Sequence, residues 1–185
     1  MLESSVLTSA TVEPAIASDE TSYFVPSIPD APWQLQGEAV AFLASPTSLR
    51  LLVRYDNSPV GPYLEHALAT LTWRGPHVFQ MSVDLEDSMI GGREIWGFPK
   101  TLESLDWTED ENRVIFRREG QTFRVRAFGP SFSLALSFWT VQQKGEDWVR
   151  VPGVIGGRAR LGFRGRQLAL VLRSFWMEIE EPQTP

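Results

Sequence analysis

The ten residues from Gly91 to Lys100 read GGREIWGFPK, and the prediction of the fold depends mainly on this stretch. Gly97 can end a helix, because glycine readily takes the left-handed conformation of a helix C-terminus. Pro99 fixes its own φ, lacks an N–H donor and drives the preceding residue to an extended conformation. The stretch therefore predicts a helix that stops at Gly97 and a turn that aims Lys100 away from it.

Lys100 is also unusual in its residue type. The chain has 17 basic residues, and only Lys100 and Lys144 among them are lysines. A lysine can be desolvated into a neutral nucleophile, whereas an arginine stays protonated. Trp96 and Phe98 precede Lys100 and are the local side chains that can enclose it. The sequence thus predicts an amine in an apolar pocket.

Working outward from this stretch, one helix is predicted from about residue 86 to residue 96. Gly91 and Gly92 lie inside it, and two reasons fit them: a close packing contact, or room kept beside a site. The rest of the chain has strand character, with turn clusters rich in glycine, proline and acidic residues between the strands. Strands are predicted at 49–55, 63–72, 77–85, 102–107, 113–118, 122–128, 132–141, 158–164 and 167–179. This pattern indicates a mainly β protein with one short helix, folded as an antiparallel barrel or sandwich.

The chain divides into two parts by composition. Residues 1–31 are rich in Ser, Thr, Glu, Ala and Pro without a sustained period, which predicts a flexible or draped N-terminal arm. Docking of Tyr23, Phe24 and Val25 on a neighbouring subunit is the alternative for this arm. Residues 32–185 are predicted to form a single β domain.

The composition of the chain excludes several classes of function. Of the 185 residues, 43% are hydrophobic and 22% charged, as in an ordinary globular protein, and the formal net charge of −6 argues against nucleic acid as a partner. There is no cysteine and there are only two histidines, so no metal site is predicted. No phosphate or dinucleotide loop is present, and no cofactor is predicted. We found no signal peptide or membrane span and expect a cytoplasmic protein.

The two motifs around Lys100 resemble the signature of the acetoacetate decarboxylase-like superfamily. Gly92-Arg93-Glu94 followed by Gly97-Phe98-Pro99-Lys100 is similar to the segment in which the lysine after the proline forms a Schiff base with a keto substrate. Upstream, Gly61-Pro62-Tyr63-Leu64-Glu65 is similar to the Gly-x-Tyr-x-Glu segment that carries an active-site glutamate. The resemblance spans roughly Trp33 to the C-terminus. It implies a closed antiparallel β-barrel, Lys100 pointing inward and a homo-oligomer.

The chemistry that the resemblance implies rests on Lys100 and Glu65 as catalytic residues. A Schiff base requires a neutral amine, a solvated lysine is almost wholly protonated near neutrality, and apolar surroundings disfavour the ammonium form. Glu65 is the candidate acid/base. Tyr63 falls on the same side of an extended strand, so it can orient the proton or the substrate. Trp96 and Phe98 would line the pocket that holds the substrate.

Two positions depart from the decarboxylating members. Thr101 stands where those members carry a second lysine, and Arg50 stands where they carry an acidic residue; the early arginine of the family is absent from Trp33 to Ser45. Two roles fit Arg50: binding a substrate carboxylate with its planar donor fork, or lying exposed on a strand. Thr101 is taken as a substrate-binding residue. The sequence predicts a Schiff-base lyase acting on a small keto or oxo acid; the alternative is a non-catalytic barrel that binds a small apolar or carbonyl ligand.

Overall fold

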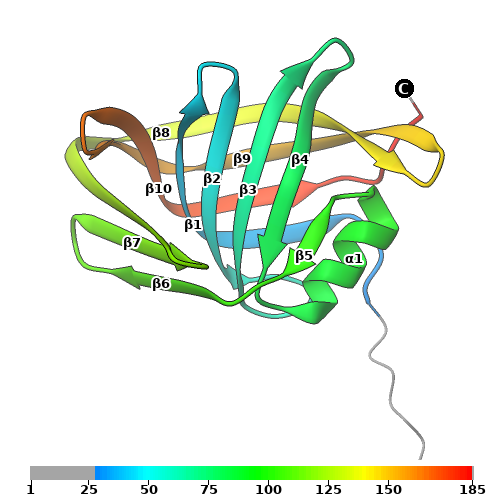
Figure 1. The fold of residues 1–185 in the computed structure, drawn as a ribbon, viewed down its shortest axis with the longest axis horizontal. Coiled ribbons are helices and arrows are strands. Elements are labelled where there is room, and N and C mark those ends of the chain that lie inside the picture. Colours follow the sequence, from blue (N-terminus) through cyan, green and yellow to red (C-terminus); the bar gives the residue numbers. More distant parts are fainter. Residues whose placement is uncertain (1–27, 185) are drawn as a thin grey trace, which may run out of the picture.

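The fold is a single ten-stranded sheet with one helix, seen in a computed structural model that describes residues 28–184 (Figure 1). This confirms a mainly β protein with one short helix. The elements in chain order are β1 (Trp33–Ser45), β2 (Ser48–Asn57), β3 (Tyr63–Thr72), β4 (Gly75–Val83), α1 (Glu86–Trp96), β5 (Lys100–Leu102), β6 (Leu105–Glu109), β7 (Arg113–Arg118), β8 (Gln121–Lys144), β9 (Asp147–Arg164) and β10 (Gln167–Ile179).

The strand order is β5-β4-β3-β2-β1-β10-β9-β8-β7-β6, so the ladder has two free ends, β5 and β6. The predicted closed antiparallel barrel differs from this sheet in two ways. In the described residues no hydrogen-bond ladder joins β5 to β6, and β4 pairs with β5 in parallel. The parallel pair follows from the crossover through α1. The ladder stays open because β6 pairs with β7 and this hairpin covers a second apolar core.

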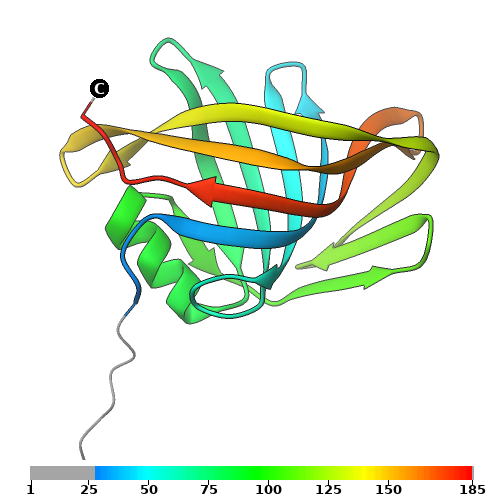
Figure 2. The ribbon, with the colours of Figure 1, turned by 180° about the vertical axis from the view of Figure 1, so that it is seen from behind.

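The sheet bends sharply enough for its two halves to face each other. Figure 1 shows β8 and β9 running across behind β2, β3 and β4, and Figure 2, seen from behind, shows them passing in front. His77 on β4 contacts the backbone oxygen of Val141 on β8, with 2.8 Å between ring Nδ1 and that oxygen. At Gly37 on β1 the register shifts toward both neighbouring strands. Such bulges bend a strand and increase its twist, so Gly37 marks a corner of the fold.

Two apolar cores lie on opposite faces of β1, β2 and β3. The first fills the space between the two halves of the sheet and includes Trp33, Tyr55, Val83, Trp96 and Phe175. The second lies under the β6–β7 hairpin and includes Val40, Leu52, Phe116, Phe123 and Val171. Because side chains alternate along a strand, these central strands bury both faces. Residues 63–72 accordingly carry apolar side chains at positions of both parities.

Two local predictions can be compared with the structure. Helix α1 has the predicted bounds, and its N-cap is Leu85. The preceding Asp84 accepts a hydrogen bond from the N–H of Leu64 at 2.7 Å. Gly129-Pro130 does not end a strand, since β8 continues through it with a register shift between Phe128 and Phe132.

The predicted arm at 1–31, including the docking residues Tyr23, Phe24 and Val25, lies almost wholly outside the described residues. Its last residues, Ile28 and Ala31, pack against the first core. Pro29 accepts a hydrogen bond from the Trp33 indole N–H at 2.8 Å. In the described part of the chain, no helix is both long enough and apolar enough to span a membrane.

Gly37→Ala tests the corner of the sheet. A Cβ at this position would lie 1.9 Å from the carbonyl oxygen of Arg54, which is backbone and cannot turn aside. We expect the free energy of unfolding to fall by about 1–3 kcal/mol, measured by urea denaturation. Gly162→Ala is the matched control, because its closest contact is 3.0 Å to a methyl group of Val171 and the loss should be smaller. Equal losses would contradict the role given to Gly37.

Candidate active site

Lys100 reaches its position through the end of α1. Gly97 takes the left-handed conformation at φ 73°, and the N–H groups of Gly97 and Phe98 donate to the carbonyls of Arg93 and Gly92, each at 3.0 Å. The chain then enters β5, where Lys100 lies opposite Met81. Arg93 Nε donates to the backbone oxygen of Lys100 at 2.6 Å. The predicted turn is therefore present, and a guanidinium on the helix fixes its far side.

The amine of Lys100 is enclosed, as predicted. The residue is 4% exposed, and Nζ lies 3.0 Å from Glu65 Oε2, whose residue is 5% exposed. Nζ also donates to Ser88 Oγ at 2.9 Å and lies 5.2 Å from the centre of the Tyr63 ring. Elements far apart in sequence thus meet at one amine: β5 carries Lys100, β3 carries Glu65 and Tyr63, and α1 carries Ser88.

Two reasons were considered for the glycines inside α1, a packing contact and room beside a site, and each reason applies to a different glycine. A Cβ on Gly91 would lie 2.8 Å from the ring of Trp33, which is a packing contact. A Cβ on Gly92 would lie 2.5 Å from Lys100 Cδ and 2.6 Å from Cε. Gly91 therefore serves packing, whereas Gly92 keeps room for the aliphatic part of the lysine.

Two buried tyrosines complete the polar end of the site. Tyr55 OH donates to Glu65 Oε1 at 3.3 Å, and the rings of Tyr55 and Tyr63 lie 4.5 Å apart between centres. Burial, and then the charge of Glu65, raise the pKa of both phenols well above their usual value. Both hydroxyls therefore remain protonated and available as donors.

Sequence reasoning missed Tyr55 and Ser88, although weak signals for both exist. Tyr55 is the partner of Tyr63 across β2 and β3, so the strand pairing identifies it. On α1 the buried residues are Ser88, Gly91, Gly92 and Trp96, a spacing of three and four that marks one helix face. Ser88 is the only polar side chain on that face.

A cavity of about 390 Å³ opens from this polar group between the two halves of the sheet. Its polar side chains are Glu65, Lys100, Tyr55, Tyr63 and Thr140, and the remaining wall is apolar or aromatic. The wall includes Trp96 and Phe98, which are 1% and 7% exposed, as the sequence predicted for an apolar surround. Trp96 is fixed by its indole N–H, which donates to the carbonyl of Glu180 at 2.7 Å.

Two predicted substrate-binding residues do not line this cavity. Thr101 follows Lys100 on β5, so its side chain alternates away; it is exposed, and Oγ1 donates to the carbonyl of Met81 at 3.2 Å. Arg50 has the opposite parity on β2 from the cavity-lining Leu49 and Leu51. Arg50 therefore does not line the cavity, and it is half-buried rather than exposed.

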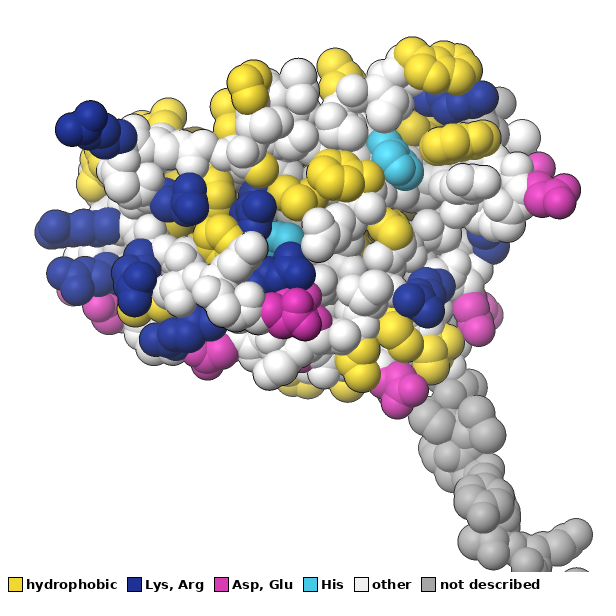
Figure 3. Space-filling view, in the orientation of Figure 1, with side chains coloured by type: hydrophobic (Ala, Val, Ile, Leu, Met, Phe, Trp, Pro, Cys, Tyr) yellow, Lys and Arg dark blue, Asp and Glu magenta, His cyan; other side chains and the backbone are white. Residues whose placement is uncertain are grey.

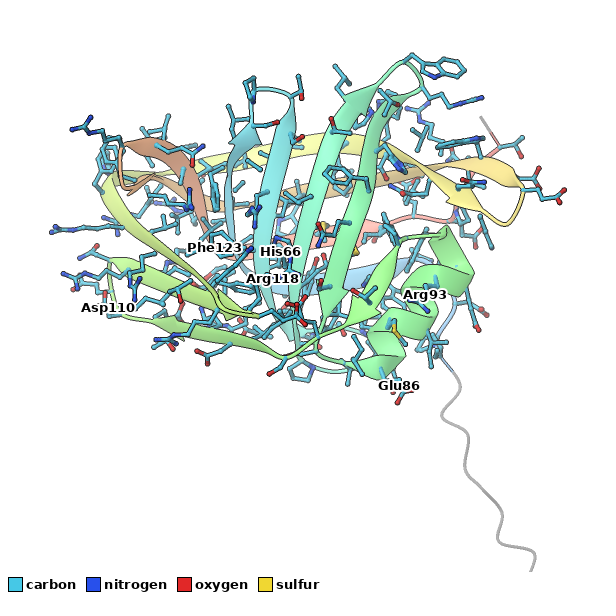
Figure 4. The ribbon with its side chains drawn as sticks, viewed as in Figure 1. His66, Glu86, Arg93, Asp110, Arg118 and Phe123 are labelled. Carbon is cyan, nitrogen blue, oxygen red and sulfur yellow. The ribbon has the colours of Figure 1, made fainter. Side chains whose placement is uncertain are left out.

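Arg50 belongs instead to a basic cluster on the second core. Arg50 Nη1 and Arg118 Nη1 lie 3.1 and 2.7 Å from the two ring nitrogens of the fully buried His66, and Figure 4 shows His66, Arg118 and Phe123 close together. Glu103 pairs with Arg118 at 2.7 Å. Burial, and then the charges of Arg118 and Arg50, lower the pKa of His66 to about 3. The neutral ring can accept only one of these contacts as a hydrogen bond.

No arginine among the described residues lines the cavity. Figure 3 shows many of the dark-blue side chains gathered over the end of the molecule where β6 and β7 lie, with others on the opposite side. Within residues 28–184, no group of three or more His, Asp or Glu side chains is placed to hold a metal ion.

Comparison with known proteins identifies a family model that matches the chain. The family model described as acetoacetate decarboxylase matches residues 42–134, which is half of the 185-residue chain and includes both motifs. A search of curated proteins found no match.

Solved structures share the fold at low sequence identity. Acetoacetate decarboxylase from Legionella pneumophila subsp. pneumophila is 14% identical with a TM-score of 0.63, covering 97% of this chain and 98% of its own. A second acetoacetate decarboxylase structure is 11% identical, TM-score 0.53, covering 88% and 92%. The enduracididine biosynthesis enzyme MppR in complex with pyruvate is 11% identical, TM-score 0.51, covering 84% and 90%. With the family match over residues 42–134, these findings lead to one conclusion: the chain belongs to the acetoacetate decarboxylase family.

Proposed function

We propose that this protein is a lyase that forms a Schiff base between Lys100 Nζ and the carbonyl carbon of a small oxo acid. The observation that carries the proposal is the 3.0 Å pairing of Lys100 Nζ with Glu65 Oε2 at the buried end of an apolar cavity. A nucleophile next to a proton acceptor is the arrangement that covalent catalysis needs. MppR was solved with pyruvate, an oxo acid, which supports this substrate class.

Formation of the Schiff base begins with proton transfer from the Lys100 ammonium to the Glu65 carboxylate. This transfer turns two buried charges into two neutral groups, which an apolar surround favours. The free amine then attacks the carbonyl carbon. The carbonyl oxygen takes one proton from the amine and one from Glu65 and leaves as water. An iminium on Lys100 and a carboxylate on Glu65 remain, so the pair regains its charges.

The iminium is then the electron sink for the next step. It accepts the electron pair of the bond to the carboxylate in a 3-oxo acid, releasing CO₂, or of a C–H bond in a 2-oxo acid, with Glu65 taking the proton. Both routes give an enamine. Protonation of the enamine carbon and hydrolysis of the iminium return the amine. Lys100 is the only cationic side chain among the described residues of the cavity wall, so positive charge is concentrated where these electrons arrive.

The other side chains of the cavity have supporting roles in this proposal. The protonated hydroxyls of Tyr63 and Tyr55 can donate to the substrate oxygen or to Glu65. Trp96 and Phe98 exclude water from the amine. Arg50 and Thr101 take no part, because they face away from the cavity.

A second candidate function is non-covalent binding of an apolar or carbonyl ligand. The observation in its favour is that the Lys100 amine is already satisfied by Glu65 and Ser88, so the unliganded site is stable as an ion pair. Covalent trapping separates the two functions.

Incubation with pyruvate and borohydride should leave a reduced adduct on Lys100, detected by intact-mass and peptide mass spectrometry. Lys100→Arg should abolish the adduct, because arginine keeps the charge and cannot supply a neutral amine. Lys144→Arg is the matched control, since it removes the only other lysine, which is exposed at the end of β8, and should leave trapping unchanged. Binding without an adduct would favour the non-covalent candidate.

Glu65→Gln should lower turnover by roughly a hundredfold or more, because the acid/base is lost, while an adduct can still be trapped at a reduced rate, because the amine remains. Turnover is followed as CO₂ release from acetoacetate or as solvent-deuterium exchange at the methyl group of pyruvate. Glu94→Gln, at an exposed position on α1, is the control. Full turnover in Glu65→Gln would remove Glu65 from the mechanism.

Gly92→Ala and Gly91→Ala form a matched pair for the position of the amine. Both place a Cβ too close to a neighbour, and both should lower the melting temperature. Only Gly92→Ala presses on the Lys100 side chain, so it alone should reduce the trapping rate, by about tenfold or more. Equal trapping by the two variants would mean that Gly92 does not position the amine.

A further inference from the structure

The cavity is much deeper than its reactive group requires. Glu65 and Lys100 are 5% and 4% exposed, whereas Leu49 and Leu136, which also line the cavity, are 38% and 44% exposed. The polar group therefore lies at the closed end and an apolar passage leads out from it. Along β3 the passage runs from Glu65 past Ala67 to Ala69, about 13 Å at the usual strand rise.

The room in this passage comes from small side chains. Ala67 and Ala69 on β3 and Ala39 and Ala41 on β1 line it on either side of β2. The cavity of about 390 Å³ lies in the range of pockets that bind drug-sized ligands. A three-carbon acid bonded to Lys100 would leave most of this apolar volume without a partner.

The passage also offers little to a polar ligand. Beyond the group around Lys100, its one polar side chain is Thr140, whose buried Oγ1 has no hydrogen-bond partner within residues 28–184. A strongly polar occupant would lose its hydration without replacement, whereas an apolar occupant gains by leaving water. The wall therefore selects for hydrocarbon or aromatic surface.

We infer that the oxo acid carries an extended apolar substituent, with its carbonyl at Lys100 and its tail between Ala67 and the mouth of the cavity. This inference rests on the proposed function for the position of the carbonyl and on the cavity alone for the tail. Each additional methylene buried in the passage should tighten binding about fourfold until the passage is full.

The experiment compares pyruvate, 2-oxobutanoate, 2-oxohexanoate and 2-oxooctanoate on the intact protein. Borohydride trapping gives the concentration for half-maximal adduct formation, and calorimetry with Lys100→Arg gives non-covalent affinity without the amine. We expect both values to fall steeply with chain length. Ala69→Phe, which fills the passage away from Lys100, should remove the advantage of the longer acids by about tenfold or more and leave pyruvate unaffected.

Two further variants sharpen the comparison. Leu68→Phe is the matched control, because it adds bulk to the same strand on the opposite face, and it should preserve the chain-length dependence. Thr140→Val removes the lone hydroxyl and should leave binding of the aliphatic acids equal or tighter. Circular dichroism and melting temperature confirm that each variant is folded.

The outcomes separate this inference from the proposed function. Adducts that form equally well with all four acids, or an Ala69→Phe variant that retains the preference for long chains, would overturn the apolar tail and leave the Schiff base standing. Chain-length-dependent binding that Ala69→Phe removes, without any adduct, would support the tail and overturn the lyase. Neither adduct nor binding with any of the acids would overturn both.

Discussion

The ion pair between Lys100 and Glu65 is the interaction on which the architecture of the site depends. Two charges removed from water are costly, and their attraction repays that cost only when further hydrogen bonds satisfy both groups. Tyr55 supplies one to Glu65, and Ser88 accepts one from Lys100. The pair is therefore held by four elements, β2, β3, β5 and α1, and each of them must be in register for the site to exist.

Strand β3 distributes its side chains between two different environments. Glu65 faces the cavity, while the next residue, His66, faces the second core, where burial, and then the charges of Arg118 and Arg50, lower its pKa and keep its ring neutral. One strand thus separates an acid–amine pair from a basic cluster by the thickness of a sheet. This explains why the cavity contains a single cation although arginine is frequent in the chain.

Much of the fold and of the site could be predicted from local sequence. The end of α1, the burial of Lys100 and the parity of Tyr63 and Glu65 follow from proline, glycine and strand alternation, which act over a few residues. The open ladder could not be predicted in this way, because it depends on where the β6–β7 hairpin packs. The surroundings of Arg50 could not be predicted for a related reason. Which face of β2 borders the cavity depends on how the whole sheet bends and packs, and the sequence of one strand does not contain that information.

Strand β5 combines a buried amine with a weak attachment to the sheet. It has three residues and pairs with β4 on one side only, so few backbone hydrogen bonds hold it. Its additional anchors are the Arg93 contact to the Lys100 carbonyl and the bond from the N–H of Glu103 to Val83. Short edge segments open at a lower free energy than the strands inside a sheet. Local fraying of this edge would therefore give solvent a second route to the amine besides the mouth of the cavity, and the rest of the domain can remain folded while it occurs.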